Sequence, residues 1–376
     1  MSGDSRSAFR VPRSSFGKVA LIHDWLTGMR GGEAVLEGML DVLPDAEIFT
    51  LFHFPGSVSE KIERRVIHTS SLQKMARRAG DYRQLLPLFP RAARQWDLRG
   101  YDLIVSSSHC VAKGVNARGI PHLCYCHTPM RYIWDRFDDY FPRSRPLRRA
   151  AVLSLVPWLR RWDVQTSAEV TQFVANSRFV RDRIRRFYDR DAEVIHPYVS
   201  TEFLTAPLET ARDDYHVIVS ALVPYKRIDL AIATAAATNR RLVIIGGGPL
   251  LEELRARRVP NVELTGPVPR AMIVERLSRA RSLILPGVED FGITPLEAMA
   301  VGTPVVAFGE GGVLDSVVPD VTGIFFARPE VESLGRALDE VESRDWDRAA
   351  IRAHAATFSR ARFDSELASA LDRVRG

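Results

Sequence analysis

Residues 283–308 read LILPGVEDFGITPLEAMAVGTPVVAF. The pattern of this stretch predicts the fold class of the surrounding chain. An apolar run at Ser282–Leu285 leads into a glycine turn, a helical pattern over Pro295–Val301 and a second apolar run at Pro304–Phe308. Short β-rich runs separated by a helix are typical of parallel β-α-β units. We therefore predict a parallel sheet covered by helices.

Two carboxylates and a helix start lie close together in this stretch. Glu289 falls in the predicted turn and Glu297 eight residues later, in the predicted first helical turn. A helix start attracts anions, because its first four N–H groups lack helical partners and the macrodipole is positive there. The segment can therefore hold a phosphate and offer two carboxylates to sugar hydroxyls. The residues that supply the N–H groups are Phe291, Gly292, Ile293 and Thr294.

A purely structural role explains half of this pattern. Thr294 suits an N-cap, Pro295 the first helical position and Glu297 the third, which together make a capping box. Glu289 has no such explanation, since it precedes the helix.

Strand and helix patterns alternate along the rest of the chain. One series runs from Lys18–His23 to Ala192–Pro197, and a second begins at His216–Ala221 after the polar, linker-like stretch Thr201–Asp214. Two such series predict an α/β protein with two Rossmann-like, doubly wound domains facing a cleft. We place the domains at 1–203 and 204–358, with ligands at the carboxyl ends of the strands.

Composition excludes several classes of protein. The chain has 376 residues, 46% of them hydrophobic and 26% charged, as in ordinary globular proteins. No apolar run approaches the ~20 residues of a membrane span. Residues 1–17 are polar and basic, so we expect a frayed tail and no signal peptide. Three cysteines, Cys110, Cys124 and Cys126, suit buried thiols of a cytoplasmic protein better than a zinc site.

Charge is distributed unevenly along the chain. Residues 1–200 have a net charge of +10 and residues 201–376 a net charge of −4, which suggests an anionic partner for the first half. Between Arg143 and Trp162, basic ends flank the apolar run Ala150–Leu159. This pattern fits a helix on an anionic membrane surface, and it fits equally a buried helix with solvated arginine ends.

Further candidate residues follow predicted strands. Gly31 and Gly32 lie in a loop where backbone can approach a ligand closely, although a plain tight turn would look the same. Lys226 is the only lysine after residue 113. This favours a site that needs a compact ammonium group over a surface lysine without a role. His127 ends the strand His122–Cys126, where a catalytic role competes with a structural one. Two Asp-x-Asp tripeptides occur about as often as chance predicts, so we expect no metal.

The segment around Glu289 and Glu297 resembles the E-x7-E signature of family 4 glycosyltransferases, which have the GT-B fold. The resemblance extends from Gly31-Gly32 to the end of the chain. It implies that the helix over 359–376 crosses back onto the first domain. The stretch from Cys126 to Tyr132, CHTPMRY, is similar to a subgroup that uses GDP-mannose with polysaccharide or lipid-linked acceptors.

The resemblance implies roles for individual residues. His127, Lys226 and Glu289 would act at the reacting centre, with Lys226 on the diphosphate and Glu289 by the sugar. Ser220 and Ala221 stand where many members have an arginine, so Arg227 would compensate or the diphosphate would be held by one cation fewer. The acceptor would contact Arg131, Trp134 and Asp135. The donor would contact Gly31, Gly32, Lys226, Arg227, Gly247, Gly248, Glu289, Phe291, Gly292, Ile293, Thr294 and Glu297.

The implied activity is transfer of a hexose, mannose above all, from a nucleotide-diphosphate sugar to a glycan or lipid-linked glycan, with retention at the anomeric carbon. No cofactor or nucleic acid is implied, and the expected location is the cytoplasm or the inner face of the membrane. One alternative is a GT-B-fold nucleotide-sugar epimerase, which needs no acceptor. A different class, a basic protein that binds nucleic acid or a membrane surface, would leave the motifs unexplained; nucleic-acid binding also lacks aromatics interleaved with the arginines.

Overall fold

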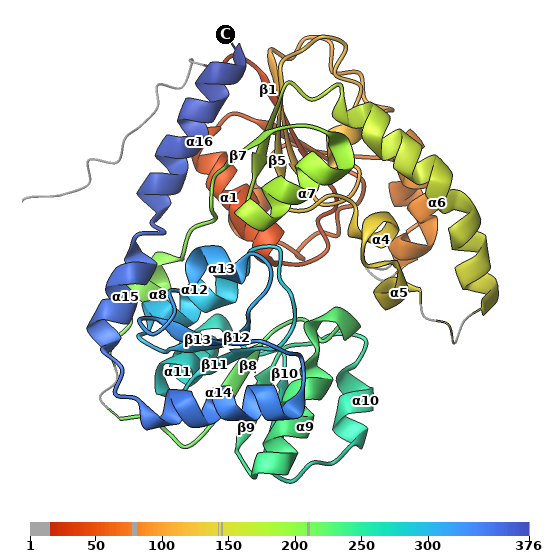
Figure 1. The fold of residues 1–376 in the computed structure, drawn as a ribbon. Coiled ribbons are helices and arrows are strands. Elements are labelled where there is room, and N and C mark those ends of the chain that lie inside the picture. The colour runs from red at the N-terminus through yellow and green to blue at the C-terminus, as the bar shows by residue number, and fades with distance from the viewer. Residues whose placement is uncertain (1–15, 77–80, 142, 144–145, 209–210, 376) are drawn as a thin grey trace, which may run out of the picture. The chain divides into compact units, whose positions relative to one another are not determined.

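The computed structural model describes the whole chain except residues 1–15, 77–80, 142, 144–145, 209–210 and 376 (Figure 1). The tail expected at residues 1–17 therefore falls almost entirely outside the described residues, as does Arg145 of the basic stretch. The chain divides into two compact units. The first comprises Met1–Met130, Pro157–Val174 and Asp364–Gly376, and the second comprises Arg131–Val156 and Ala175–Phe363.

The described residues form a seven-stranded sheet in the order β3-β2-β1-β4-β5-β6-β7. Each strand pair among β1 to β5 is parallel. The strands are β1 (Val19–His23), β2 (Glu47–Thr50), β3 (Ile67–Thr69), β4 (Leu103–Ser108), β5 (His122–Cys126), β6 (Gln172–Ala175) and β7 (Ala192–Val194).

A second, six-stranded sheet among the described residues has the order β10-β9-β8-β11-β12-β13, and all its pairs are parallel. The strands are β8 (His216–Val219), β9 (Leu242–Ile245), β10 (Val262–Gly266), β11 (Leu283–Leu285), β12 (Val305–Phe308) and β13 (Gly323–Phe326). Counted from its own first strand, this sheet has the 3-2-1-4-5-6 order of a Rossmann fold, and six strands of the first sheet share it. The predicted fold class is confirmed.

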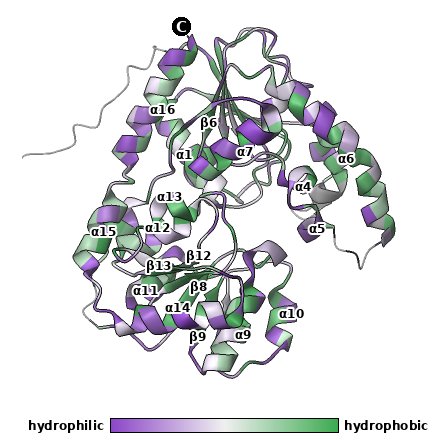
Figure 2. Cartoon of the chain, in the orientation of Figure 1, coloured by the Kyte–Doolittle hydropathy of each residue, from purple (hydrophilic) through white to green (hydrophobic). Residues whose placement is uncertain are grey.

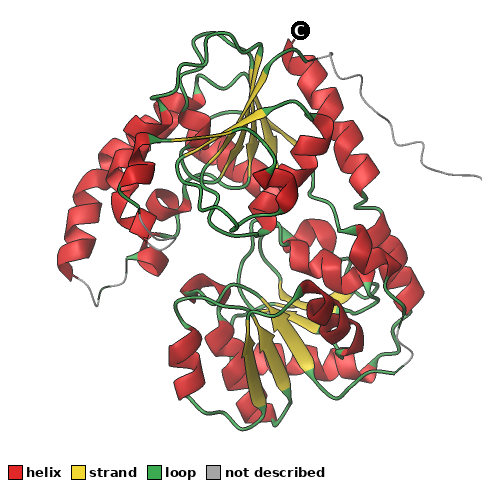
Figure 3. Ribbon diagram, turned by 180° about the vertical axis from the view of Figure 1, so that it is seen from behind, coloured by secondary structure: helices red, strands yellow, loops and turns green. Residues whose placement is uncertain are grey.

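Helices lie on either side of the strands of each sheet (Figure 3). The longer helices are α1 (Gly31–Val42), α6 (Pro146–Ser167), α7 (Arg178–Tyr188), α9 (Ile228–Thr238), α11 (Arg270–Arg279), α12 (Ile293–Ala300), α14 (Val331–Ser343), α15 (Arg348–Ala356) and α16 (Arg360–Arg375). The shorter α-helices are α2 (Glu60–Glu63), α3 (Phe89–Ala93), α4 (Arg131–Trp134), α5 (Phe137–Tyr140), α8 (Thr201–Thr205), α10 (Leu251–Ala256) and α13 (Val313–Ser316). Short 3-10 helices are η1 (Ser71–Lys74), η2 (Asp81–Leu88), η3 (Ala112–Gly114) and η4 (Pro224–Lys226).

Both faces of the second sheet are buried. Leu283 and Leu285 of β11 belong to one apolar cluster, and Ile284 between them belongs to another. Alternate residues of a strand point to opposite faces, so the continuous apolar run reflects helices packed on both sides. The strands are accordingly hydrophobic in Figure 2.

Some expected elements differ from the structure. The helix expected over 359–376 is α16, which begins at Arg360, and α15, which ends at Ala356, is a separate helix before it. The Ser359 hydroxyl accepts a hydrogen bond from the backbone N–H of Arg362 at 3.2 Å, which caps the new helix. The predicted linker at 201–214 contains α8. The three cysteines are free and buried, as expected.

Candidate active site

The second unit brings Lys226 and Glu289 together. Lys226 ends η4, just after β8, and Glu289 follows β11, the neighbouring strand. Their side chains form an ion pair, and each is 14% exposed. Burial, the largest effect, lowers the pKa of Lys226, but Glu289 more than offsets it, and the pKa lies above its usual value. The ammonium therefore stays charged at the topological switch point of the sheet, where ligands of such folds bind.

Glycine at position 287 makes this pairing possible. A Cβ there would lie 2.4 Å from the carbonyl oxygen of Tyr225 and 2.8 Å from the Cα of Lys226. Only glycine lets the end of β11 approach the η4 turn so closely.

Arg131 of the predicted acceptor group lies beside this pair. It forms an ion pair with Asp290, and its guanidinium is 5.3 Å from the centre of the Tyr225 ring. The Lys226 ammonium lies 5.3 Å from the centre of the same ring. Arg131 and Lys226 thus share one aromatic neighbour.

Asp135 and Trp134, the other predicted acceptor residues, contact helix α7. Asp135 accepts a hydrogen bond from Arg183 at 2.7 Å, and Arg183 also donates to Asp290 at 2.7 Å. Trp134 stacks on Phe187, with ring centres 4.7 Å apart and 14° between the planes. These contacts fix the end of the 131–135 segment within the second unit.

The helix start of α12 differs from the predicted capping box. The helix begins at Ile293, and its N-cap is Gly292, with a φ of 86° that favours glycine. Thr294 is therefore inside the first turn, and Glu297 lies too far along the helix to complete a box. The Phe291 side chain is buried and stacks on His196, so only its backbone is left for a ligand.

Glu297 belongs to a different set of contacts from Glu289. Its carboxylate lies 3.4 Å from Arg270, which also pairs with Glu202 at 2.7 Å. Burial raises the pKa of Glu297 to about 7, which Arg270 opposes and Glu202 reinforces. This carboxyl group changes its charge near neutral pH.

The remaining predicted donor residues of the second unit are in turns. The backbone N–H of Leu222 donates to the carbonyl of Gly247 at 2.9 Å, and that of Leu251 donates to the carbonyl of Gly248 at 3.1 Å. The first bond holds the turns after β8 and β9 against each other, and the second lies within the turn after β9. Arg227 adopts a positive φ of 51° and pairs with Asp229 at 3.3 Å.

In the first unit, His127 and Gly32 lie close together. A Cβ on Gly32 would be 3.9 Å from the Nε2 of His127 and 3.7 Å from the Cε1 of His23. The Ser107 hydroxyl is 2.8 Å from Nε2 of His127 and 3.0 Å from Nδ1 of His23. Gly31 and Gly32 start α1, so their N–H groups belong to the helix start rather than to a preceding loop.

Buried polar groups connect to His127 through Ser107. The Nε2 of His23 lies 3.7 Å from Glu33, which is 4% exposed. Burial acts to raise the pKa of Glu33, but its contact with His23 outweighs burial and the pKa is lowered. A chain of polar contacts thus runs from His127 through Ser107 and His23 to an ionised Glu33.

Asp24 organises the neighbouring loop. Its two carboxylate oxygens accept four backbone hydrogen bonds of 2.7–2.9 Å from residues 109–112, and its side chain is fully buried. Bonds to a charged acceptor are strong. The loop after β4 is therefore bound tightly to the end of β1.

Sequence reasoning missed several of these residues. Asp24 directly follows a predicted strand and Asp290 directly follows Glu289, so their positions were a usable signal. Ser107 and Arg183 gave none, since a serine in a strand and one arginine among many on a helix are unremarkable. Tyr225 directly precedes Lys226, so its position was a usable signal as well.

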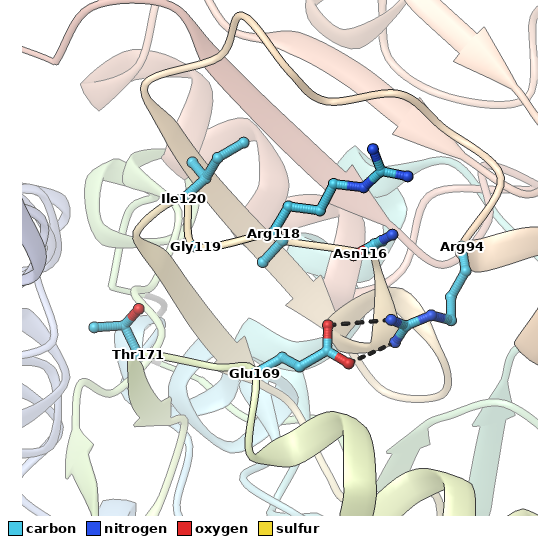
Figure 4. Close-up of a pocket in the computed structure, with 8 residues that line it drawn as sticks. Arg94, Asn116, Arg118, Gly119, Ile120, Glu169 and Thr171 are labelled. Carbon is cyan, nitrogen blue, oxygen red and sulfur yellow. Dashed lines mark hydrogen bonds and ion pairs between the residues drawn. The ribbon is translucent and has the colours of Figure 1, made fainter.

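A separate hollow of about 440 Å³ lies at the opposite end of the first sheet (Figure 4). Asn116, Arg118 and Thr171 line it, and Arg94 spans it to pair with Glu169 at 2.7 Å. It adjoins the amino ends of β5 and β6, away from the carboxyl ends that bear the motifs. Within the described part of the chain, no group of three His, Cys, Asp or Glu side chains could hold a metal ion.

Two family descriptions match the chain. Residues 30–203 match "Glycosyltransferase Family 4", and residues 201–358 match "Glycosyl transferases group 1". With the two Rossmann-ordered sheets, these matches place the chain among the glycosyltransferases of the GT-B fold. More particularly, it belongs to family 4 of these enzymes, as the E-x7-E resemblance implied.

Curated relatives agree with this family at low identity. The chain is 32% identical over 209 residues to the GDP-mannose-dependent alpha-(1-6)-phosphatidylinositol monomannoside mannosyltransferase of Mycolicibacterium smegmatis, covering 47% of this chain and 54% of that protein. It is 30% identical over 241 residues to a D-inositol 3-phosphate glycosyltransferase of a Mycobacterium species, covering 57% and 52%. The chain thus spans about half the length of these relatives.

Among solved structures, Anabaena HepE in complex with UDP has a similar fold. Its TM-score is 0.69 at 17% identity, over 95% of this chain and all of that one. A sucrose-phosphate synthase from Thermosynechococcus elongatus has a TM-score of 0.60 at 17% identity, over 95% of this chain and 96% of that one.

Proposed function

We propose that this protein transfers a hexose from a nucleotide-diphosphate sugar to an acceptor hydroxyl and retains the anomeric configuration. The observation on which this rests is the partly buried Lys226–Glu289 pair at the switch point of the second sheet. A charged lysine there can stabilise the departing nucleoside diphosphate, and the neighbouring carboxylate can bind sugar hydroxyls. The helix start at 292–294 adds N–H donors for phosphate oxygens.

The chemical step that we propose is attack from the face on which the leaving group departs. The acceptor oxygen bonds to the anomeric carbon as the bond from that carbon to the phosphate oxygen breaks. The acceptor proton passes to the departing phosphate oxygen. A covalent enzyme intermediate would need a carboxylate nucleophile beside the sugar, whereas Glu289 and Asp290 are both held in ion pairs.

In the first unit, His127 would contact the transferred sugar, and the N–H groups of Gly31 and Gly32 would contact the donor. Support comes from the hydrogen bond between His127 and Ser107 and from the closeness of His127 to Gly32. Trp134 and Asp135 would contact the acceptor. We propose Glu297 as the ligand of the nucleotide ribose, with the turn at Gly247 and Gly248 beside it.

GDP-mannose is the donor that we propose, with a glycan or lipid-linked glycan as acceptor. The CHTPMRY motif and the named donor of the mycobacterial relative support this choice. A thermal-shift panel of GDP-, UDP- and ADP-sugars tests it, because a ligand that binds only the folded state raises the melting temperature. We expect the largest rise with GDP-mannose. A flat response to the whole panel would contradict the proposal.

Lys226→Ala should abolish most of that ligand-induced rise and lower turnover by about 100-fold or more, as loss of one transition-state donor does elsewhere. Lys18→Ala is a matched control, because Lys18 is half exposed and pairs with Glu47. Unchanged turnover in Lys226→Ala would remove this lysine from the site. Conversion of the donor to its epimer without acceptor would favour the epimerase alternative.

We further propose that α6 lies on an anionic membrane surface. Leu147, Leu153 and Trp158 are 87%, 45% and 48% exposed, and Arg160 and Arg161 are exposed near them. Both hydrophobic and hydrophilic residues run along this helix in Figure 2. Exposed apolar side chains beside arginines suit the lipid interface. None of the described helices is long and apolar enough to span a membrane.

Co-sedimentation with liposomes tests this second proposal. The protein should bind vesicles that contain phosphatidylglycerol more than pure phosphatidylcholine vesicles, and salt should weaken the binding. Trp158→Ser should reduce it, whereas Val66→Ser, at a 58% exposed apolar position elsewhere, should not. Equal binding to both vesicle types would contradict the proposal.

A further inference from the structure

The second unit gathers two cations on one aromatic ring, and only one of them has so far been assigned to the diphosphate. Lys226 and Arg131 each lie 5.3 Å from the centre of the Tyr225 ring. We propose that Arg131 is the second cation of the diphosphate site, next to Lys226, rather than a contact for the acceptor. This inference rests on the proposed function and assigns a further residue to it.

Adjacent acids hold the two cations in the unliganded protein. Glu289 pairs with Lys226, and Asp290, the next residue, pairs with Arg131. Burial has the largest effect on the pKa of Lys226 and lowers it, Glu289 raises it, and the charge of Arg131 opposes Glu289. Arg131 is therefore close enough to repel the ammonium. A polyanion between the two cations would relieve that repulsion.

The charge of the leaving group calls for more than one cation. A terminal phosphate bears about two negative charges near neutral pH. Lys226 supplies one positive charge, and Ser220 and Ala221 on the preceding turn supply none. An arginine adds a planar fork that matches two phosphate oxygens, which a second lysine would not.

Other arginines of the second unit fit this role less well. Both terminal nitrogens of Arg183 are engaged, one with Asp135 and one with Asp290, each at 2.7 Å. Arg227 has a 40% exposed side chain that lies against Asp229. Arg131 is 20% exposed, and its ion pair joins it to the residue next to Glu289. Its guanidinium can exchange the Asp290 carboxylate for a phosphate without leaving Tyr225.

Calorimetric affinities for nucleoside diphosphates and monophosphates test the inference. GDP, UDP and ADP, each with its monophosphate, are titrated into the wild type, Arg131→Met and Arg131→Lys. We expect Arg131→Met to weaken diphosphate binding about 10- to 100-fold, the range for a hydrogen bond to a charged group. Monophosphate binding should change far less. Arg131→Lys should recover part of the loss, and it answers the question alone if Arg131→Met does not fold.

A matched variant distinguishes a role of Arg131 in diphosphate binding from a purely structural role. Asp290→Asn removes the same ion pair but keeps the guanidinium, so it should keep the preference for diphosphate over monophosphate. An equal loss in Asp290→Asn and Arg131→Met would make the role of Arg131 purely structural and overturn the inference. Wild-type diphosphate affinity in Arg131→Met, with a raised KM for the acceptor, would return Arg131 to the acceptor. If the wild type binds none of the three diphosphates, the proposed function itself fails.

Discussion

Glu297 shows how a single buried carboxyl group can make this protein sensitive to pH. Burial raises its pKa from an ordinary 4.5 to about 7. Between these values the unfolded chain has lost the proton and the folded protein keeps it, so folding stability falls as pH rises from about 4.5 to about 7. The group is neutral in mild acid and charged in mild base.

Replacing Glu297 with Gln should therefore stabilise the unliganded protein at pH 8 but not at pH 4.5, where both states of the wild type are largely protonated. Melting temperatures of both proteins at the two pH values check this. The ionised carboxylate also accepts more hydrogen bonds from ribose hydroxyls, so the wild-type KM for the donor should fall as pH rises through about 7. A KM in Glu297→Gln with the same pH dependence would exclude Glu297 as the source.

At this scale the sequence predicted which residues matter better than how they are held. Lys226 and Glu289 were both chosen, but their ion pair joins segments 63 residues apart. The capping box failed because Gly292, with its positive φ, starts the helix two residues earlier than Thr294 allows. A local sequence pattern can rank candidate caps, but the position at which the chain leaves the preceding strand decides where the helix starts.

Among the elements, α6 is anchored to the first unit at one end. The Lys113 ammonium is 2.9 Å from the buried Asp163 of α6, and the Trp162 ring covers Gly114. A Cβ on Gly114 would lie 2.3 Å from that ring. The fit leaves no room for a methyl group.

Gly114→Ala should therefore lower the free energy of unfolding by about 1–3 kcal/mol, as overpacking typically does. Chemical denaturation followed by tryptophan fluorescence measures this. Gly335→Ala is the matched control, because Gly335 lies in α14 and a Cβ there would meet Thr238 at an ordinary distance of 3.7 Å. This substitution should stabilise the helix by up to about 1 kcal/mol. Similar losses in the two variants would argue against the packing explanation.

The predicted alternation of strands and helices is confirmed for most elements, since long apolar runs bounded by polar residues are strong signals. Length does not separate the missed strands β2, β3 and β13, of three or four residues each, from β11, which has three residues and was predicted. The missed runs become strands because a neighbouring strand offers them backbone hydrogen bonds. The start of the last helix was predicted to within one residue, since α16 begins at Arg360 directly after the Ser359 cap.

For the whole molecule, the charge arithmetic predicts that transfer needs no divalent metal. Lys226, Arg131 and the α12 start would together offset the diphosphate charge. Activity, measured as release of nucleoside diphosphate, should survive EDTA. The Lys226→Ala variant serves as the inactive reference. Loss of activity in EDTA and its recovery with Mn²⁺ would show that these groups do not suffice. The domain limits of 203 and 358, and the cleft between the domains, stay predictions.

The helix α16 has a consequence for how the protein is made. Residues 364–376 belong to the first unit, although the second unit supplies most of the chain before them. Leu367, Ala370 and Leu371 are fully buried, and Arg375 lies 5.8 Å from the Phe16 ring. During synthesis these residues leave the ribosome only after the whole second unit, so until then the first unit has an apolar surface uncovered. A nascent chain stalled before residue 364 is thus a natural client for chaperones, however completely its second unit has folded.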